Sequence, residues 1–340
     1  MTDAFALADA TLSTYLKSAL PGFRGPLKST KFKGGQSNPT YLIEAISGNY
    51  VLRAKPPGVL LASAHAVDRE FRMLVALEGS AVPVAKGLHL CRDDSITGSM
   101  FYVMSHVPGR IFWDPALPEV PAMARAAYFD EILRVLAALH SVDVATVGLS
   151  DYGKPGNYFA RQLRRWSEQY RASELTPNAD MEALIHWLGA HLPEDDGSVS
   201  LVHGDWRIDN LIFDAEQPCI RAIVDWELST LGHPLSDLGY FCMALRLPRN
   251  PVIPGLMGID RAAYGIPSEL QLVERYAQLT GRTHIPHWPF MLAFNFFRLA
   301  AIAQGVAKRA AQGNASNASA DSTGKLVPVI AALGIEAAGA

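Results

Sequence analysis

Two segments, LVHGDWRIDNLIF at residues 201–213 and AIVDWE at residues 222–227, combine short apolar runs with acidic and amide side chains. Asp205, Asn210 and Asp225 follow or interrupt these runs, where a rigid strand ends and a loop can present a side chain to a cleft. One aspartate can orient a hydroxyl group and accept its proton, while an asparagine and a second aspartate can supply the hard oxygen ligands that magnesium prefers. The set therefore indicates magnesium-dependent phosphoryl transfer.

A structural interpretation of these side chains is the alternative. Aspartate and asparagine often begin loops as Asx turns, and for any one of the three residues alone that role is the more typical one. The ordered set, with His203 and Gly204 directly in front of Asp205, favours the catalytic interpretation.

The remaining sequence predicts an α+β protein with two lobes. Over residues 1–105, a helical pattern at residues 3–20 precedes short extended runs, and these surround a second helical pattern at residues 64–77; the lobe is predicted to be a small antiparallel sheet with one long helix. From residue 106 onward, amphipathic helical patterns dominate, interrupted by the apolar runs of residues 200–225. We therefore expect an N-terminal lobe over residues 1–105 and a larger, mainly helical lobe over residues 106–340.

The motifs of the second lobe resemble the catalytic loop and metal-binding segment of the aminoglycoside phosphotransferase and choline kinase families, which share the protein-kinase-like fold. His203–Gly204–Asp205 stands where protein kinases carry His-Arg-Asp, and Asp225–Trp226–Glu227 stands where they carry Asp-Phe-Gly. The branch resembled is the kinase-like domain associated with acyl-CoA dehydrogenase family members 10 and 11. Further matching segments are GGQSNPTYLI (34–43), YVLRAKPPG (50–58), REFRML (69–74), FYVMSHVPGR (101–110) and STLGHPLSDLGY (229–240).

This resemblance, which spans residues 28–310, implies roles in the catalytic lobe. Asp205 is the expected general base, and Asn210 and Asp225 are the expected magnesium ligands. Arg207 stands where protein kinases often carry a lysine. It either neutralises charge on the transferring phosphoryl group or pairs with an acid of the fold.

The N-terminal lobe carries the expected nucleotide-binding residues. A loop between two predicted strands stands where kinases cover the phosphates, and its glycines let backbone N–H groups approach phosphate oxygens, although an ordinary hairpin turn would look the same. The loop consists of Gly34, Gly35, Gln36, Ser37 and Asn38.

By the resemblance, Arg53 occupies the position of the phosphate-pairing lysine, and Glu70 is its expected partner. An arginine keeps the charge of a lysine and adds a planar fork for phosphate or carboxylate. Lys55 and Arg69 are alternative cations, and a solvated basic strand edge is the structural alternative. Met104 is expected near the adenine, although apolar core packing would also explain it.

Composition narrows the functional classes. The 340 residues include 30 basic and 33 acidic residues, so no global charge attracts nucleic acid or an anionic membrane. The three cysteines are far apart and fit a reducing cytoplasm. The N-terminal residues lack the basic region of a signal peptide, and the apolar stretch Met291–Ala307 is shorter than a membrane helix. We expect a cytoplasmic protein that acts on a small molecule, while the oligomeric state stays open.

The function expected from these features is an ATP- and magnesium-dependent small-molecule kinase that transfers the γ-phosphate to an alcohol group. The acceptor implied by the fused relatives is a hydroxyacyl-CoA or a hydroxy acid, ahead of an aminoglycoside. The first alternative is a nucleotide-binding, pseudokinase-like module, supported only by Arg53 at the lysine position. A dehydrogenase is the second, but no GxGxxG motif follows the first strand.

Overall fold

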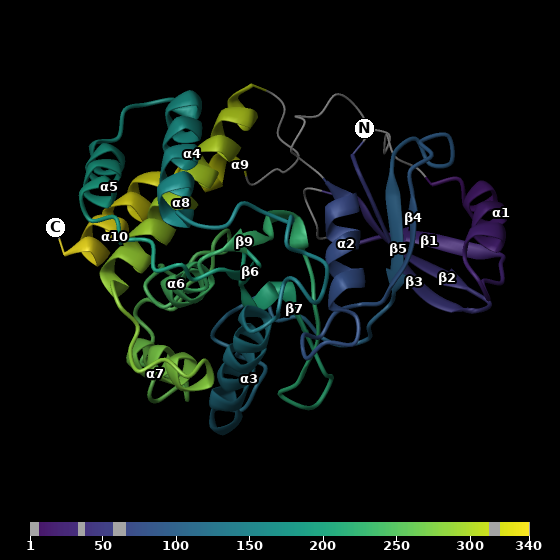
Figure 1. The fold of residues 1–340 in the computed structure, drawn as a ribbon, viewed down its shortest axis with the longest axis horizontal. Coiled ribbons are helices and arrows are strands. Elements are labelled where there is room, and N and C mark those ends of the chain that lie inside the picture. Colours follow the sequence, from purple (N-terminus) through teal and green to yellow (C-terminus); the bar gives the residue numbers. More distant parts are fainter. Residues whose placement is uncertain (1–6, 33–37, 57–65, 313–319, 340) are drawn as a thin grey trace. The chain divides into compact units, whose positions relative to one another are not determined.

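The computed structural model describes residues 7–32, 38–56, 66–312 and 320–339, and it divides into two compact units (Figure 1). The first comprises Met1–Gly109 with Arg221–Glu227, and the second comprises Arg110–Ile220 with Leu228–Ala340. The division expected from the sequence differs, because it places residues 221–227 in the second lobe. In the structure this segment, which includes Asp225, packs with the first unit.

A five-stranded antiparallel sheet with the strand order β1-β2-β3-β5-β4 forms the centre of the first unit. One helix packs on each face of it, α1 against β1 and α2 against β4 and β5 (Figure 1). The elements are α1 (Asp9–Ala19), β1 (Leu27–Lys31), β2 (Thr40–Ala45), β3 (Gly48–Ala54), α2 (Val67–Leu77), β4 (Gly87–Cys91) and β5 (Phe101–Ser105).

Alternation along β3 decides which side chains face each helix. Leu52 and Ala54 belong to the apolar cluster that α1 covers with Leu12 and Leu16. Because successive side chains of a strand point to opposite faces, Arg53 lies on the α2 face. Thr40 of β2 and Tyr102 of β5 pair with Arg53 in register and therefore share this face.

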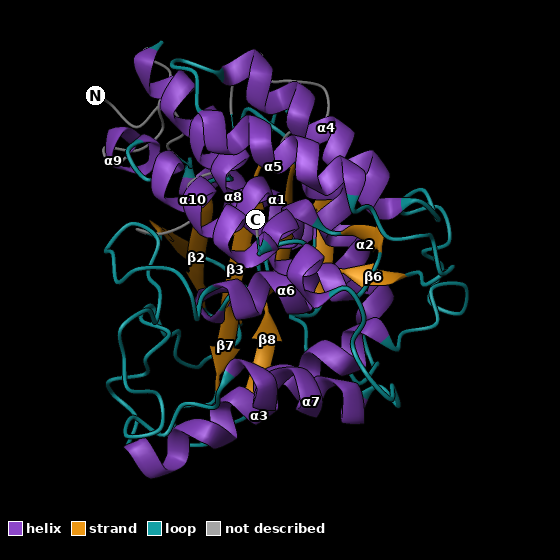
Figure 2. Cartoon of the chain, turned by 90° about the vertical axis from the view of Figure 1, so that its left-hand side faces the viewer, coloured by secondary structure: helices purple, strands orange, loops and turns teal. Residues whose placement is uncertain are grey.

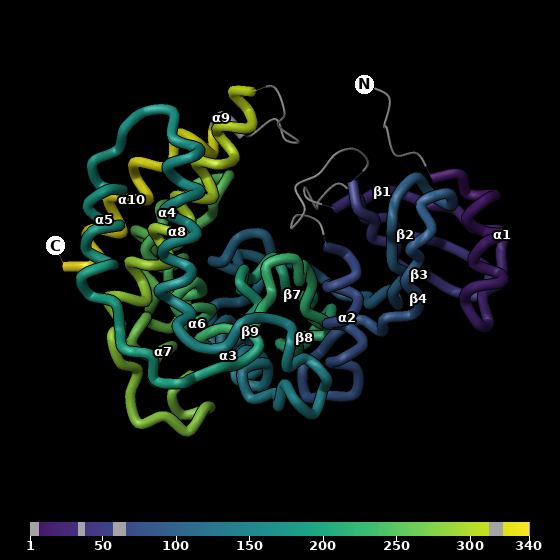
Figure 3. Tube along the Cα trace, turned by 45° about the horizontal axis from the view of Figure 1, so that its top comes forward, coloured from purple at the N-terminus to yellow at the C-terminus, as the bar shows by residue number. Residues whose placement is uncertain are grey.

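The second unit is mainly helical, and Figures 2 and 3 show α4, α5, α8 and α10 gathered side by side. Its helices are α3 (Ala122–His140), α4 (Tyr158–Ser173), α5 (Ala179–Ala190), α6 (Leu235–Met243), α7 (Glu269–Leu279), α8 (Trp288–Ala311), α9 (Ala320–Gly324) and α10 (Val327–Ala338). Its strands are β6 (Ser200–Val202), β7 (Leu211–Phe213) and β9 (Thr230–Gly232), and β8 (Ile220–Ile223) leads from it into the first unit.

Helix α8 extends beyond the apolar stretch Met291–Ala307 at both ends. It has 24 residues, and within the described ranges it is the one helix long and apolar enough to cross a membrane by length and composition. Its most apolar window is 83% buried inside the protein. Packing against α4, α6, α9 and α10 accounts for this apolar character, since a helix that is apolar all round is typical of a protein core.

Candidate active site

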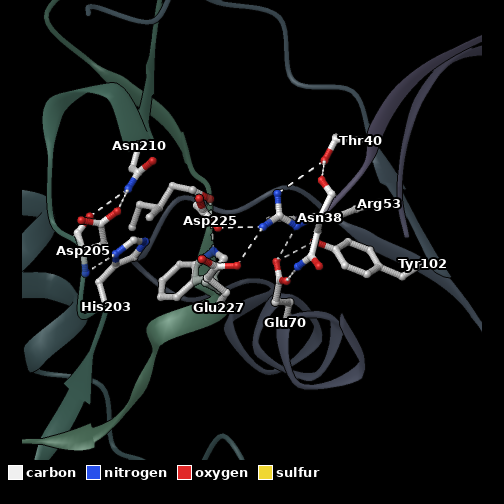
Figure 4. A network of polar contacts seen from close by, with 12 residues as sticks. Asn38, Thr40, Arg53, Glu70, Tyr102, His203, Asp205, Asn210, Asp225 and Glu227 are labelled. Atoms are coloured by element: carbon white, nitrogen blue, oxygen red, sulfur yellow. Dashed lines mark hydrogen bonds and ion pairs between the residues drawn. The ribbon is translucent and has the colours of Figure 1, made fainter. Parts of the chain in front are cut away.

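Arg53 is the centre of a polar network in the first unit (Figure 4). Its Nε lies 2.9 Å from Glu70 Oε2, and its Nη2 donates a hydrogen bond to Asp225 Oδ1 at 2.7 Å. Glu227 Oε2 lies 3.9 Å from the same Nη2. The buried guanidinium thus joins β3 and α2 to the segment of residues 221–227, and it contacts more negative charge than it carries.

Glu70 is buried, and its carboxylate is held by three partners. Asn38 Nδ2 donates to Oε1 at 2.8 Å, and the Tyr102 hydroxyl donates to Oε2 at 3.3 Å. Burial raises the pKa of the Glu70 carboxyl, and the Arg53 guanidinium opposes that shift. Burial works against the charge of Arg53, but the Glu70 and Asp225 carboxylates outweigh it and raise the pKa of the guanidinium. Arg53 therefore stays charged.

Asp225 adopts a backbone conformation that is uncommon for a residue with a side chain. Its φ is +64°, in the left-handed region, which costs about 1–2 kcal/mol in residues other than glycine. The next residue, Trp226, is buried and donates its Nε1 hydrogen to Ile223 O at 3.2 Å, which anchors the turn. The Asp225 side chain keeps 30% of its surface exposed, so its carboxylate is open to a ligand. Such local strain is common at functional sites.

In the second unit, the buried carboxylate of Asp237 organises the loop that carries Asp205. It accepts hydrogen bonds from the backbone N–H groups of His203 at 2.7 Å and Gly204 at 2.9 Å. Gly204 has a φ of +82°, and a Cβ there would lie 2.6 Å from Leu228 O. Only glycine fits this turn, which explains the Gly-Asp pair. The ring Nδ1 of His203 accepts a hydrogen bond from the backbone N–H of Asp205, with 3.2 Å between the two nitrogens.

The Asp205 carboxylate lies among donors of its own loop and of α6. Asn210 Nδ2 donates to Asp205 O at 2.9 Å and to Oδ2 at 3.0 Å, as Figure 4 shows. Arg207 Nε lies 3.4 Å from Oδ1, and the Tyr240 hydroxyl also hydrogen-bonds to the carboxylate. Burial works to raise the pKa of Asp205, but the Arg207 charge and the Tyr240 bond help to lower it. Asp205 is therefore ionised at neutral pH, as a proton acceptor must be.

The expected site residues fall into two groups. Asn38, Arg53, Glu70 and Asp225 meet in the first unit, and Asp205, Arg207 and Asn210 meet in the second. Arg207 also donates to Asp209 Oδ2 at 2.9 Å, so it pairs with an acid of the fold. Met104 lies in β5 opposite Val51, outside the Arg53 network. Gly34, Gly35, Gln36 and Ser37 lie outside the described residues.

Sequence reasoning did not single out Tyr102, Glu227, Asp237, Tyr240 or Arg298. All but Arg298 stand in matching segments, which were the available signal: Asp237 and Tyr240 in STLGHPLSDLGY, Tyr102 in FYVMSHVPGR and Glu227 in AIVDWE. Tyr102 shares the face of Arg53 by strand register, which a residue-by-residue search for titratable groups does not reveal.

Comparison with known proteins identifies the family. Residues 28–276 match the family model described as the phosphotransferase enzyme family, APH. The chain belongs to this family. The phosphotransferase is 44% identical over 330 residues to acyl-CoA dehydrogenase family member 10 of Mus musculus, and 41% identical over 336 residues to family member 11 of the same species. Each alignment covers 96% of this chain, but only 31% and 42% of those relatives, which are much longer proteins.

Solved structures support the same assignment. A crystal structure from Ralstonia eutropha JMP134, provisionally assigned as an aminoglycoside phosphotransferase, is 44% identical, has a TM-score of 0.89, and covers 98% of this chain and 99% of its own. The macrolide 2′-phosphotransferase MphH of Brachybacterium faecium, at 19% identity and a TM-score of 0.60, covers 94% of this phosphotransferase and 97% of its own chain, and shares the fold. The predicted α+β, protein-kinase-like fold is thereby confirmed.

The buried Asp237 carboxylate yields a pH-dependent prediction. Burial works to raise its pKa, but hydrogen bonding from His140 and the Gly204 N–H lowers it below the ordinary 3.8. Its stabilisation is therefore present above pH 3.8 and is lost as the pH falls below that value. Asp237→Asn leaves a buried donor unpaired, so we expect it to cost roughly 1–3 kcal/mol at pH 7.

The measurement is the Tm of parent and variant from pH 7 down to pH 3. The Tm difference should shrink as the pH falls below about 3.8, because the parent also loses the charge there. The exposed Asp94→Asn serves as the control and should match the parent throughout. A Tm difference that stays constant with pH would contradict the assignment.

Proposed function

We propose that this phosphotransferase transfers the γ-phosphate of ATP, with magnesium, to the hydroxyl group of a small molecule. The observation that carries the proposal is the Asp205 loop. It presents one ionised carboxylate whose neighbours are an asparagine amide and an arginine. In support, a thermostable mutant of the aminoglycoside phosphotransferase APH(4)-Ia, at 14% identity and a TM-score of 0.63, was crystallised in a ternary complex with AMP-PNP and hygromycin B.

The residues present fit a magnesium–nucleotide complex. Asp225 has an exposed carboxylate, and Asn210 has an amide oxygen; both are hard ligands. Within the described ranges, no group of three or more His, Cys, Asp or Glu residues forms a metal cage. Magnesium suits such a site because it usually takes one or two protein ligands, with phosphate oxygens and water supplying the rest. Bound magnesium would neutralise charge developing on the phosphate oxygens.

Each residue then has a defined task. Asp205 orients the acceptor hydroxyl and accepts its proton at the carboxylate. Arg53 contacts the phosphates with its fork, and Glu70 holds it in place. Arg53 Nη2 donates a hydrogen bond to the Asp225 carboxylate. A bound nucleotide would compete for the guanidinium through its phosphates, and the Asp225 carboxylate would then be available to magnesium. Most of the rate acceleration comes from positioning and charge neutralisation.

For the acceptor, we favour a hydroxylated acyl group, such as a hydroxyacyl-CoA or a hydroxy acid, over an aminoglycoside. The support is that two relatives at 44% and 41% identity are named acyl-CoA dehydrogenase family members and are much longer than this chain. The words acyl-CoA dehydrogenase in these names fit the part of each relative that lies outside the aligned region, so the acceptor is inferred from the protein part to which this domain is joined. The direct test is a screen of hydroxyacyl-CoAs, free hydroxy acids and aminoglycosides with ATP labelled in the γ-phosphate. Transfer to an aminoglycoside alone would contradict the acceptor class.

Asp205→Asn tests the general base. The variant keeps the size of the side chain but removes the charge and the proton acceptor. We expect ATP binding and the Tm to stay near those of the parent, while phosphoryl transfer falls by a factor on the order of 10² to 10⁴. Near-parental transfer in the folded variant would overturn the role of Asp205. Nucleotide binding without transfer in the parent would instead favour the pseudokinase-like module.

Asp225→Ala tests the metal ligand. We expect loss of ATP turnover and strongly weakened magnesium-dependent ATP binding, measured by calorimetry with and without magnesium. Asp114→Ala is the matched control, because Asp114 has the same 30% exposure and also pairs with an arginine, Arg249, at 2.7 Å. The control should bind magnesium–ATP as the parent does. If Asp225→Ala also does so, magnesium is held elsewhere.

Arg53 is tested by two variants. Arg53→Ala should raise the KM for ATP and lower kcat, together by roughly tenfold to a hundredfold, because hydrogen bonds to charged groups contribute about 1.5–3 kcal/mol. Arg53→Lys should retain part of the activity, since the charge survives but the bidentate fork does not. The Tm of each variant separates this effect from the cost of leaving Glu70 unpaired. Unchanged kinetics in Arg53→Ala would exclude a phosphate contact.

A further inference from the structure

Arg298 is a buried charge within the apolar helix α8. The residue is only 4% exposed, and most other buried residues of this helix are apolar. Within the described part of the chain, no carboxylate lies close enough to form an ion pair with it, although its charge helps to lower the pKa of the Asp205 carboxyl. Burying a cation without a paired anion costs several kcal/mol, and an apolar side chain of similar length would fill the same space at less cost. The charge therefore calls for a functional explanation.

The contacts of Arg298 lead to the Asp205 loop. Its Nη2 donates a hydrogen bond to Gly204 O, the carbonyl directly before Asp205. The guanidinium also lies over two aromatic rings, 5.4 Å from the centroid of Tyr240 and 5.7 Å from that of Trp166. Both rings supply the cation–π attraction that makes a buried arginine tolerable.

Two routes connect Arg298 to the position of Asp205. The first is the peptide chain at Gly204, whose N–H is held by Asp237 and whose carbonyl is held by Arg298. Hydrogen bonds therefore hold both the N–H and the carbonyl group of Gly204. The second route is Tyr240, whose ring packs on the guanidinium and whose hydroxyl bonds to the Asp205 carboxylate. Arg298 thus contacts groups on both the backbone route and the side-chain route to Asp205.

We propose that Arg298, acting together with Tyr240, is a positioning residue that holds Asp205 in a single catalytic orientation. This inference rests on the proposed function, in which Asp205 is the general base. A base must lie within hydrogen-bond reach of the proton that it accepts, and a misplacement of about 1 Å can cost about a hundredfold in rate.

The experiment compares Arg298→Met, Arg298→Lys and Tyr240→Phe with the parent. For each protein, kcat, the KM for ATP, the dissociation constant of magnesium–ATP and the Tm are measured. We expect kcat to fall about tenfold to a hundredfold in Arg298→Met and Tyr240→Phe. The KM for ATP and the dissociation constant should stay near parental values, because neither residue belongs to the Arg53 network. Arg298→Lys should recover part of kcat by restoring a donor.

Matched controls separate positioning from stability. Arg125 is also buried, donates to the carbonyls of Leu117, Val120 and Tyr264, and lies over the Tyr264 ring, far from Asp205 in the sequence. Tyr170 is a buried tyrosine whose hydroxyl donates to a carboxylate, that of Glu174. Arg125→Met and Tyr170→Phe should lower the Tm but leave kcat per folded molecule unchanged.

Loss of kcat in Arg125→Met equal to that in Arg298→Met would overturn the proposal. If the parent transfers no phosphate to any acceptor or to water, the proposed function fails, and crystal structures decide the present inference independently. In Tyr240→Phe, the Asp205 carboxylate should then leave its parental rotamer, and in Arg298→Met the Gly204 carbonyl should turn. Unchanged positions of both groups would refute the positioning role. If Arg298→Met does not fold, an unchanged Asp205 rotamer in Tyr240→Phe refutes it alone, because that variant removes a single hydroxyl.

Discussion

The first unit depends on one buried guanidinium, that of Arg53. It contacts Glu70 from α2 and Asp225 from the segment of residues 221–227, so it joins parts of the chain that are 172 residues apart. A buried cation of this kind is stable only with paired carboxylates and well-made hydrogen bonds. More carboxylates surround it than one cation neutralises, which is consistent with the proposed magnesium. This balance of charge relates the packing of the unit to its proposed binding of magnesium–ATP.

In the second unit, the corresponding set of buried polar contacts is made by the backbone of Gly204. Asp237 of α6 accepts a hydrogen bond from the Gly204 N–H, and Arg298 of α8 donates one to the Gly204 carbonyl. An anion and a cation on two helices therefore hold the same residue. The left-handed conformation of Gly204 turns the chain into the loop that carries Asp205 and, five residues later, Asn210. In the proposed function, the helical framework around α8 would therefore support the loop that carries Asp205, and this role would explain why so apolar a helix contains a buried arginine.

The comparisons establish the family and the fold, while the contacts of the site residues support the proposed chemistry. Membership of the phosphotransferase enzyme family rests on residues 28–276 and on a relative structure with a TM-score of 0.89. The contacts of Asp205 and Arg53 explain how such a fold can serve phosphoryl transfer. The fold does not determine the acceptor, since function belongs to the site and not to the fold.

The sequence by itself determined the α+β class, and it suggested which residues carry the proposed chemistry. The five-residue spacing of Asp205 and Asn210 lies within one loop, and strand alternation places Arg53 opposite Leu52 and Ala54. Such relations are local, so covalent geometry sets them. Only the tertiary structure decided that residues 221–227 pack with the first unit, and that Arg298 reaches Gly204 across 94 residues. These partners are chosen by packing of distant segments, and in the sequence a buried Arg298 is merely a polar interruption of an apolar helix.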